Sequence, residues 1–583
     1  MNWTATSPFP VNWTEPGHGP NRSVNIPGLI SVIIFYVIIF AAGIYASWRS
    51  KKKNEGRTQT SEDLMLAGRS LGMVVGLFTM TATWVGGAFI NGTAEMVFSP
   101  GFGLAWCQAP FCYSVSLALG GFIFAKPMRE AGYTTMLDPF NDRYGPVMAG
   151  LLYIPALMGE TFWSGAVLSA LGSSLAVILN LDHTLSVLVS AGIAVVYTMV
   201  GGLYSVAYTD VVQLVCIFIG LWLGVGFSLF NPAVSNIAST MTGGTDGWLG
   251  DFPKDQSLGL WIDNFFLLSL GGIPWQVYFQ RVLSSTSANR ARILSVLACF
   301  GCFLMAVPAI ITGAIAKSTD WNATSYVEQG GILPIPAEDH KLILPMVLRY
   351  LCPLPVALVG LGAVSAAVMS SADSSILSAA SMFSHNIYAP IRNAVCCGKE
   401  ASDKEVIWLM RLGIIIVGAF ATLMAITVES IYGLWYLCSD LCFVVLFPQL
   451  VCVVYFKRAN TYGALAGFLV GFALRFTGGE ALVGLPPLIK YPYFDEETNT
   501  QNFPFKTLAM LLSFGSIIVI SLIVRCIYAR LMPDADLDYI LLRRATLKSK
   551  GPVSEDSNEN YKNKNQTDYD ETDYTPDEKV SSM

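Results

Sequence analysis

Long runs of apolar residues recur along the chain from Ile26 nearly to Tyr528, separated by short polar segments. A helix that crosses a bilayer needs about 20 mostly apolar residues, so runs of this length predict membrane-spanning helices. We expect about thirteen spans. They lie near residues 27–48, 70–95, 101–125, 146–179, 184–201, 207–230, 259–280, 291–316, 344–388, 405–427, 431–456, 461–477 and 507–529.

The composition excludes an ordinary water-soluble protein. Of 583 residues, 53% are hydrophobic and only 13% are charged, against about 25% charged residues in soluble proteins. Most cysteines fall inside apolar segments and the four histidines in loops or at span ends, which argues against a haem, zinc or histidine-relay site. We therefore expect an all-α polytopic membrane protein that is not an enzyme, uses no organic cofactor and does not bind nucleic acid.

Basic residues predict the direction of the chain through the membrane. Lys and Arg concentrate in alternate loops, beginning with residues 49–57 after the first span, while the intervening loops 231–258, 319–343 and 478–505 are poor in base. Basic loops stay on the cytoplasmic side of a membrane. Because the predicted number of spans is odd, we expect an extracellular N-terminus and a cytoplasmic C-terminus.

Asn-X-Ser/Thr sequons support this orientation. Those at Asn2, Asn12 and Asn322 lie in segments assigned to the outside, which makes these residues candidate glycosylation sites. Asn322 is the best candidate. The sequons at Asn91, at a span end, and Asn565, in the inner tail, are expected to be chance matches.

Two predicted spans are interrupted by glycine. Gly86-Gly87 breaks the span 70–95, and Gly271-Gly272 with Pro274 breaks the span 259–280, each beside a tryptophan. Freed backbone groups at membrane depth must be satisfied by protein, water or an ion, and paired breaks of this kind indicate a transporter's binding site. The alternative is that each glycine pair only allows close helix packing.

The predicted spans that begin at the two breaks form two sets of equal number. Five predicted spans run from each break, and since five is odd, the second set starts from the opposite side of the membrane, as in an inverted repeat. We expect an extracellular N-terminus (1–26), a first transmembrane helix (27–48), two inverted repeats (70–230 and 259–456), two C-terminal transmembrane helices (461–529) and a disordered cytoplasmic tail (530–583).

The tail is polar and acidic after Pro552, a composition that cannot bury enough surface to fold alone. Arg543-Arg544-Ala545-Thr546 is similar to a basic-directed kinase site. Leu541-Leu542 is similar to a sorting signal read by trafficking adaptors. The alternative for this stretch is a juxtamembrane amphipathic segment.

Short motifs identify a resemblance. The stretches "TMTATWVGG", "TMLDPF", "GGLYSVAYTDVVQL", "GGIPWQ", "YFQRVLSS" and "VSAAVMSSADSSILSA" together resemble the sodium:solute symporter family, in particular its choline-carrying members, over roughly residues 27–529. The resemblance implies a LeuT-like fold and sodium- and chloride-dependent choline uptake by alternating access. It also implies block by hemicholinium-type compounds and a place in the plasma membrane of presynaptic terminals and in synaptic vesicle membranes, where choline supplies acetylcholine synthesis.

Aromatic residues at the breaks suit such a substrate. A quaternary ammonium such as choline has a permanent charge and no N–H group, so aromatic faces attract it where a directed hydrogen bond cannot. Trp84 and Trp275 lie at the two breaks, and Tyr113 and Trp163 lie on the third and fourth spans. In the family these four positions form the substrate pocket. Trp435 is expected either to cap the pocket or to belong to an interfacial belt.

The span 344–388 combines small residues, serines and a carboxylate, and a carboxylate at membrane depth indicates a functional site. Sodium needs several oxygen ligands, which broken helices and nearby hydroxyls supply. We expect a first sodium site formed by the carbonyls of Ala82, Val85 and Ala367 with the hydroxyls of Ser370 and Ser371. The alternative is a serine-rich helix that only packs closely.

A second cation site is expected by analogy with other members of the superfamily, which use the equivalent stretch. It would involve Tyr208, Asp210, Asp373 and Ser374. Asp210 has an alternative role as an N-terminal helix cap. No cluster of basic residues within the spans marks a chloride site.

Two other functions stay open at this point. A symporter for a sugar, vitamin or carboxylate would need hydrogen-bonding or cationic side chains at the breaks, where this chain has tryptophans. An ion channel or solute sensor would keep the cage and the sodium site without accumulating substrate.

Overall fold

The computed structural model describes residues 25–53, 60–200, 203–243, 247–254, 257–395, 401–496 and 498–532. The chain divides into two units, Met1–Val524 and Arg525–Met583, and the first unit contains every site discussed below. Asn2, Asn12 and the tail motifs lie outside the described residues.

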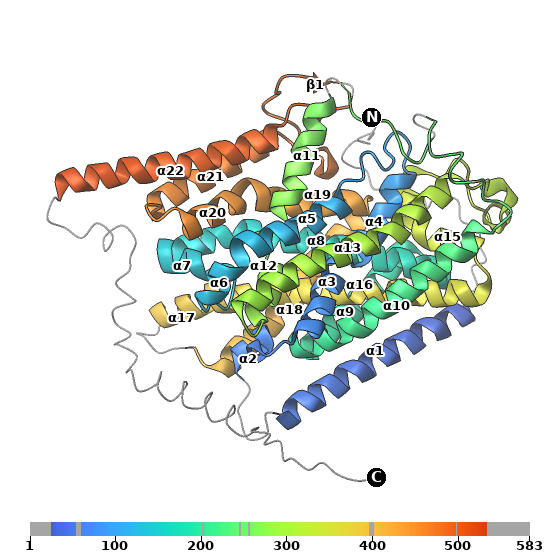
Figure 1. The fold of residues 1–583 in the computed structure, drawn as a ribbon, viewed down its shortest axis with the longest axis horizontal. Coiled ribbons are helices and arrows are strands. Elements are labelled where there is room, and N and C mark those ends of the chain that lie inside the picture. The colour runs from blue at the N-terminus through green and yellow to red at the C-terminus, as the bar shows by residue number, and fades with distance from the viewer. Residues whose placement is uncertain are drawn as a thin grey trace, which may run out of the picture. The chain divides into compact units, whose positions relative to one another are not determined.

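The described chain is almost entirely helical (Figure 1). A first helix and a short connecting pair precede the first break. The helices up to residue 229 are α1 (Ile26–Lys53), α2 (Ser61–Leu66), η1 (Ala67–Arg69), α3 (Met73–Trp84), α4 (Gly87–Phe98), α5 (Ala109–Gly120), the π-helical η2 (Gly121–Ala125), α6 (Lys126–Glu130), α7 (Asp138–Tyr144), α8 (Pro146–Leu179), α9 (His183–Val200) and α10 (Leu203–Leu229).

The second half follows the same plan with longer connections. Its elements are α11 (Ser257–Gly271), α12 (Gln276–Ser284), α13 (Ala288–Lys317), η4 (Trp321–Ala323), α14 (Ser325–Glu328), η5 (Ala337–Leu342), α15 (Ile343–Leu351), α16 (Leu354–Met382), η6 (Phe383–Tyr388), α17 (Ala389–Val395), α18 (Asp403–Thr427), α19 (Ile431–Leu441), η7 (Cys442–Leu446), α20 (Phe447–Tyr455), α21 (Thr461–Thr477), η8 (Ala481–Val483) and α22 (Phe505–Leu531). Two short strands, β1 (Phe494–Asp495) and β2 (Thr500–Gln501), pair antiparallel.

The helices account for the predicted spans in order. In the part of the chain that the structure describes, nine helices are long and apolar enough to cross a membrane, and the bent pair α3–α4 makes a tenth. Shorter apolar helices lie within α9 and α21. The remaining predicted span is α11 with α12, whose second half contains the buried polar residues Gln276, Gln280 and Arg281.

Two predicted spans start too early. The segment 101–125 becomes helical only at α5, because Gly101 and Gly103 have φ angles of 79° and 73°, a left-handed conformation that an α-helix cannot contain. The segment 344–388 is divided into α15 and α16 at Cys352 and Pro353. Proline has no backbone N–H and disfavours helical geometry in the residue before it.

Burial differs strongly between central and peripheral helices. The most apolar stretch of α8 is 94% buried, whereas that of α1 is 22% buried and exposes Ile30, Ile33, Ile34 and Val37. Figure 1 shows α1 along one edge of the bundle and α8 inside it. A helix with large exposed apolar residues on one side faces lipid in a membrane protein.

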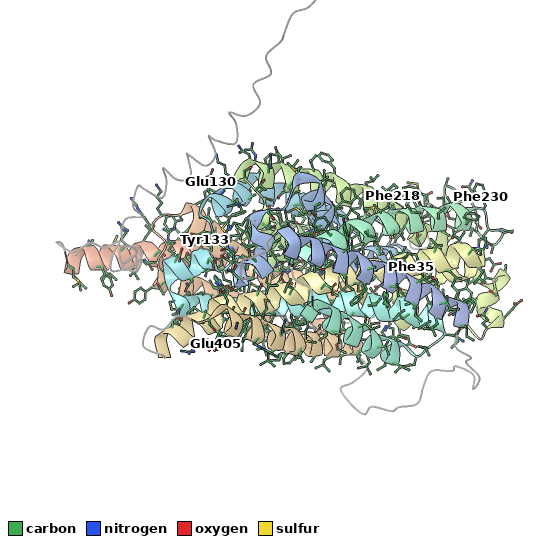
Figure 2. The ribbon with its side chains drawn as sticks, turned by 90° about the horizontal axis from the view of Figure 1, so that it is seen from below. Phe35, Glu130, Tyr133, Phe218, Phe230 and Glu405 are labelled. Carbon is green, nitrogen blue, oxygen red and sulfur yellow. The ribbon has the colours of Figure 1, made fainter. Side chains whose placement is uncertain are left out.

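Loops on alternate connections meet at the same end of the bundle. The Arg129 guanidinium, in the last turn of α6, donates a hydrogen bond of 2.8 Å to the carbonyl of Ser285, after α12. Figure 2 shows Glu130 and Glu405 toward this end and Phe230 toward the other. Base-rich loops therefore share one end, as the topology predicts; that this end faces the cytoplasm stays a prediction.

Candidate functional site

The first predicted break is present and is closely packed. Helix α3 ends at Trp84, α4 begins at Gly87, and the two axes differ by 45°. A Cβ atom on Gly86 would lie 1.8 Å from the Ser371 hydroxyl, and one on Gly87 would lie 2.2 Å from a methyl of Val368. Glycine is therefore required here, because α16 lies directly against the unwound backbone.

The second predicted break separates α11 from α12. Trp275 is extended, with φ −123° and ψ 130°, and its N–H bonds to the carbonyl of Ile273 at 2.8 Å. Pro274 has no N–H to continue the helix. A Cβ on Gly271 would lie 2.4 Å from the Ser439 carbonyl oxygen, so α19 packs on this break as α16 packs on the first.

The structure brings the five aromatic residues singled out in the sequence into one group, called here the aromatic cluster. Around Trp275, the ring centroids of Trp163, Trp84 and Tyr113 lie at 5.2, 5.6 and 5.8 Å. Trp435 lies 5.1 Å from Tyr113 and 6.0 Å from Trp163. No member is more than 4% exposed. Trp435 therefore belongs to the cluster and not to an interfacial belt.

The cluster offers ring faces and a few hydrogen-bond donors. The indole N–H groups of Trp84, Trp275 and Trp435 are buried and have no hydrogen-bond partner among the described residues. The Tyr113 hydroxyl is engaged by Ser439 and by the Cys438 thiol at 3.1 Å. Buried polar groups normally have partners. The arrangement suits an organic cation that also carries an oxygen acceptor.

Two aromatic residues at the margin of the cluster were missed by the sequence reasoning. The ring of Tyr278 lies 6.0 Å from that of Trp84, and Phe89 lies 5.4 Å from Trp435. Tyr278 follows Trp275 by three residues on α12, so helical spacing was an available signal. Phe89 stands in an apolar run that gives no such signal.

The predicted first sodium site is partly assembled. The Ser371 hydroxyl donates a 2.9 Å hydrogen bond to the carbonyl of Thr83 and lies 3.5 Å from the carbonyl oxygen of Ala82. Val85 is the C-cap residue that follows α3. The Ser370 hydroxyl points elsewhere and donates to a carboxylate on α10. The structure describes only the helical position of Ala367 in α16.

A second buried group, called here the polar seam, joins both broken helices to α10 and α16. The Asp210 carboxylate accepts hydrogen bonds from the hydroxyls of Thr79 and Ser370 and lies 3.7 Å from the Arg281 guanidinium. Arg281 also donates to the Ser374 hydroxyl. The side chains of Arg281 and Asp210 are fully buried. Asp210 lies within α10, so it is not an N-terminal cap.

In the structure, residues of the predicted second cation site contact other groups. Asp373 accepts a 2.8 Å hydrogen bond from Thr198 on α9, while Asp210 and Ser374 both contact Arg281. Tyr208 precedes Asp210 by two positions on α10, and at 3.6 residues per turn their side chains leave the helix on different sides. The second cation site stays a prediction. The Arg281 guanidinium would compete with a cation for Asp210 and Ser374.

Arg281 lies one position beyond the predicted span 259–280, so the hydropathy pattern counts it among the basic residues of a cytoplasmic loop, whereas the structure buries it within α12. Three other acids at membrane depth join helices. Glu95 accepts from Ser430 at 2.6 Å, Glu160 accepts from Ser375, and Asp440 pairs with Arg475.

The two sequons that lie in the described residues differ in accessibility. Asn322 is exposed in η4, which a glycan requires. Asn91 is 1% exposed, and its side chain donates to the carbonyl of Ala170 at 3.2 Å. Glycosylation at Asn322 stays a prediction.

Comparisons with known proteins agree with this architecture. The model of the Sodium:solute symporter family matches residues 64–471. High-affinity choline transporter 1 of Torpedo marmorata is 54% identical over 528 residues, covering 89% of each chain. High affinity choline transporter 1 of Homo sapiens is 54% identical over 529 residues, covering 89% of this chain and 90% of the human one. Sodium/glucose cotransporter 1 of Ovis aries is 24% identical over 539 residues, 81% and 74% of the two chains.

A solved structure also matches most of the chain. The substrate-bound, outward-open state of a Na+-coupled sialic acid symporter aligns with 85% of this chain and 98% of its own, with a TM-score of 0.67 and 15% sequence identity. This likeness concerns the fold, and it confirms the LeuT-like arrangement with two broken helices that the sequence predicts. The family match spans more than half of the chain, and the chain belongs to the sodium:solute symporter family.

Proposed function

We propose that this chain is a symporter that takes up choline together with sodium. The observation that carries the proposal is the aromatic cluster, in which rings from both broken helices and three further helices gather in the protein interior. The names of relatives that are 54% identical over 89% of the chain support the choice of choline. The family, whose members are transporters, supports transport over enzymatic chemistry.

Contacts between choline and the rings of the aromatic cluster can supply the free energy that binding requires. A desolvated contact between a cation and an aromatic face contributes about 2 kcal/mol. Three or four such contacts supply most of the roughly 8 kcal/mol that corresponds to micromolar affinity. The unpartnered indole N–H groups of Trp84, Trp275 and Trp435 are donors for the choline hydroxyl oxygen. No carboxylate is needed in contact with the trimethylammonium group.

Sodium binds, in this proposal, where α16 lies against the first break. The backbone carbonyls of Ala82 and Val85 and the hydroxyl of Ser371 form its core, with Ala367 and Ser370 completing the set. The contact of the Ser371 hydroxyl with the Thr83 and Ala82 carbonyls supports this position. A sodium ion here would bind the unwound end of α3 to α16 and so favour the closed arrangement around choline.

The second cation site is proposed to depend on Arg281. In the arrangement seen, the guanidinium contacts Asp210 and Ser374. A sodium ion bound to Asp210, Ser374 and Asp373, near Tyr208, would displace it and free α12 from α10 and α16. The polar seam would then act as a latch between the broken helices and the rest of the bundle during alternating access.

We further propose chloride dependence, block by hemicholinium-type compounds, and location in the plasma membrane of presynaptic terminals and in synaptic vesicle membranes, with trafficking adaptors at the tail. Choline uptake would there supply acetylcholine synthesis. A cation entering down 100 mV gains about 2.3 kcal/mol, and each coupled sodium adds its own electrical and concentration terms. These proposals rest on the names of the relatives and on the expected orientation, with the base-rich loops in the cytoplasm.

The test is uptake of radiolabelled choline into proteoliposomes that contain the purified full-length chain. Choline is expected to accumulate when a sodium gradient points inward and to stop when the gradient is dissipated. Replacing chloride with gluconate is expected to reduce uptake, and hemicholinium is expected to compete with choline. Radiolabelled glucose serves as the control substrate.

Three outcomes would contradict the proposal. Choline-gated current without accumulation would favour a channel. Accumulation of glucose but not choline would favour a symporter for another solute. Choline accumulation that does not depend on the sodium gradient would contradict the proposed coupling of choline uptake to sodium.

A further inference from the structure

A groove with a volume of about 810 Å³ opens on the outside of the bundle, away from the aromatic cluster and the polar seam. It lies between the end of α9, the π-helical turn η6 and the first half of α18. Its walls are mostly apolar. The lining includes Met199, Tyr388, Glu405, Trp408, Arg411, Leu412 and Ile415.

The groove faces the lipid. Trp408, Leu412 and Ile415 are 70%, 51% and 48% exposed, and their spacing of three or four residues puts them on one side of α18. Large apolar side chains exposed on a membrane-spanning helix meet acyl chains rather than water. Glu405, in the first turn of α18, marks one end of the bundle in Figure 2. The groove therefore lies within the leaflet nearest to that end.

Arg411 is the unusual feature of this surface. It lies in the third turn of a membrane-spanning helix, is exposed, and forms no ion pair within the described residues. Its guanidinium lies 5.5 Å from the ring of Trp408, one turn closer to the start of α18. The side chain thus leans toward the membrane surface, as a long basic side chain does to reach a polar headgroup.

The neighbouring carboxylates are occupied by other groups. Asp403 accepts from the backbone N–H of Ser61 at 3.0 Å and from its hydroxyl. Glu405 accepts from the Tyr388 hydroxyl at 2.9 Å and from Arg392 at 3.1 Å. The charge of Arg411 is therefore not neutralised by an ion pair within the described residues, and the groove presents an apolar channel lined also by Arg411 and by the Glu405 carboxylate, which is paired with Arg392.

We propose that this groove binds one anionic phospholipid. An acyl chain lies along Leu412 and Ile415, and the headgroup phosphate contacts Arg411 below the membrane surface. Arginine matches phosphate oxygens in a bidentate geometry, and a lipid with a second anionic group gains further attraction. Anionic lipids concentrate in the cytoplasmic leaflet, the leaflet in which the proposed orientation puts the start of α18. The inference concerns a site separate from choline transport.

The test uses the purified full-length chain and two lipids with identical acyl chains, dioleoyl phosphatidylserine and dioleoyl phosphatidylcholine. Lipid retained by the protein is measured by native mass spectrometry after incubation with an equimolar mixture. The wild-type chain is expected to retain phosphatidylserine in excess. Arg411→Gln is expected to lower that preference about fivefold, the ratio that about 1 kcal/mol per basic residue gives, and Arg411→Lys is expected to keep much of it.

Two further variants test whether the lipid preference arises in the groove. Leu412→Trp fills the groove and is expected to reduce retention of both lipids. Arg458→Gln neutralises an exposed arginine in the loop between α20 and α21 and is expected to leave the preference unchanged. An unchanged lipid ratio in Arg411→Gln would overturn the proposal, as would an equal loss in Arg458→Gln, since the preference would then reflect the overall basic surface.

Discussion

The aromatic cluster and the polar seam both include residues of the two broken helices, and both are buried. The cluster consists of indole and phenol rings, and its polar atoms are uncharged. The seam contains a guanidinium and a carboxylate 3.7 Å apart, with serine and threonine hydroxyls around them. Ring faces attract a cation, and its departure leaves no unpaired charge among them. Separating a buried ion pair does leave unpaired buried charges, which costs free energy.

This difference assigns separate tasks to the two regions. A substrate site must release its cargo, and neutral ring faces allow the cargo to leave without exposing an unpaired buried charge. A latch must hold one helix arrangement until something competes for it, and an ion pair has that property. The first break joins the two regions, since Trp84 belongs to the cluster and Ser371, beside Ser370 of the seam, lies against Gly86.

The largest effect is expected from breaking the seam on one side only. Arg281→Gln leaves the Asp210 carboxylate buried without its cation, which costs about 3–5 kcal/mol. The thermal unfolding temperature of the purified chain and the surface abundance in cells are both expected to fall. Choline uptake is expected to fall with them. The double variant Asp210→Asn with Arg281→Gln removes both charges and is expected to regain most of the stability.

Arg290→Gln is the matched control, because this arginine is exposed at the start of α13. If the single and double variants of the seam were equally unstable, the ion pair would not be the source of the effect.

The next effect is expected in the cluster and should concern affinity more than stability. Trp84→Ala or Trp275→Ala removes one ring face, worth about 2 kcal/mol, so half-maximal uptake should need roughly thirtyfold more choline. At low choline, uptake is then lost while surface abundance is kept. Phenylalanine at either position retains a face and should retain part of the uptake.

Trp222→Ala, on α10 and packed in a separate apolar group, controls for loss of a tryptophan. Wild-type choline affinity in both cluster variants would remove these rings from the site.

A smaller effect is expected where the two regions meet. Gly86→Ala puts a methyl group 1.8 Å from the Ser371 hydroxyl, and overpacking of this kind costs about 1–3 kcal/mol. Thermal stability and sodium-driven uptake should both decline. Gly226→Ala, on α10 with no atom within 4 Å of the added Cβ, should change neither. Equal behaviour of the two variants would contradict the close approach of α16 to the break.

The smallest effect separates sodium from choline. Ser371→Ala removes one proposed ligand oxygen, worth about 1 kcal/mol, so half-maximal activation should need roughly fivefold more sodium. Choline affinity at saturating sodium should change little. Ser381→Ala is the control, since that hydroxyl lies on the same helix and donates to the carbonyl of Ser378. A sodium activation curve identical to wild type would exclude Ser371 from the site.

The sequence predicted the cluster better than the seam for a physical reason. Trp84 and Trp275 stand beside glycine pairs, and a glycine pair inside an apolar run is a local signal that needs no partner to be interpreted. Asp210 and Arg281 have meaning only together, and they are 71 positions apart by number, so only the fold, which packs α10 and α12 against α3 and α16, reveals the pair. Asp210 alone was consistent with a helix cap.

The helices were predicted nearly in full because apolar length alone defines a span. The errors lay at helix starts, where Gly101, Gly103 and Pro353 override hydropathy through backbone geometry. Side-chain directions were the least predictable property. Ser370 and Ser371 are adjacent, yet one donates to Asp210 and the other to the carbonyl of Thr83, because neighbours on a helix point about 100° apart.

The central claim is that the aromatic cluster holds the choline cation. The most direct measurement is an experimental structure of the full-length chain in the presence of sodium and choline. The account predicts choline density with its quaternary nitrogen within about 6 Å of the ring centroids of Trp84 and Trp275 and of at least one other cluster member. Choline bound elsewhere, or tightly packed cluster rings with no ligand between them at saturating choline, would contradict it.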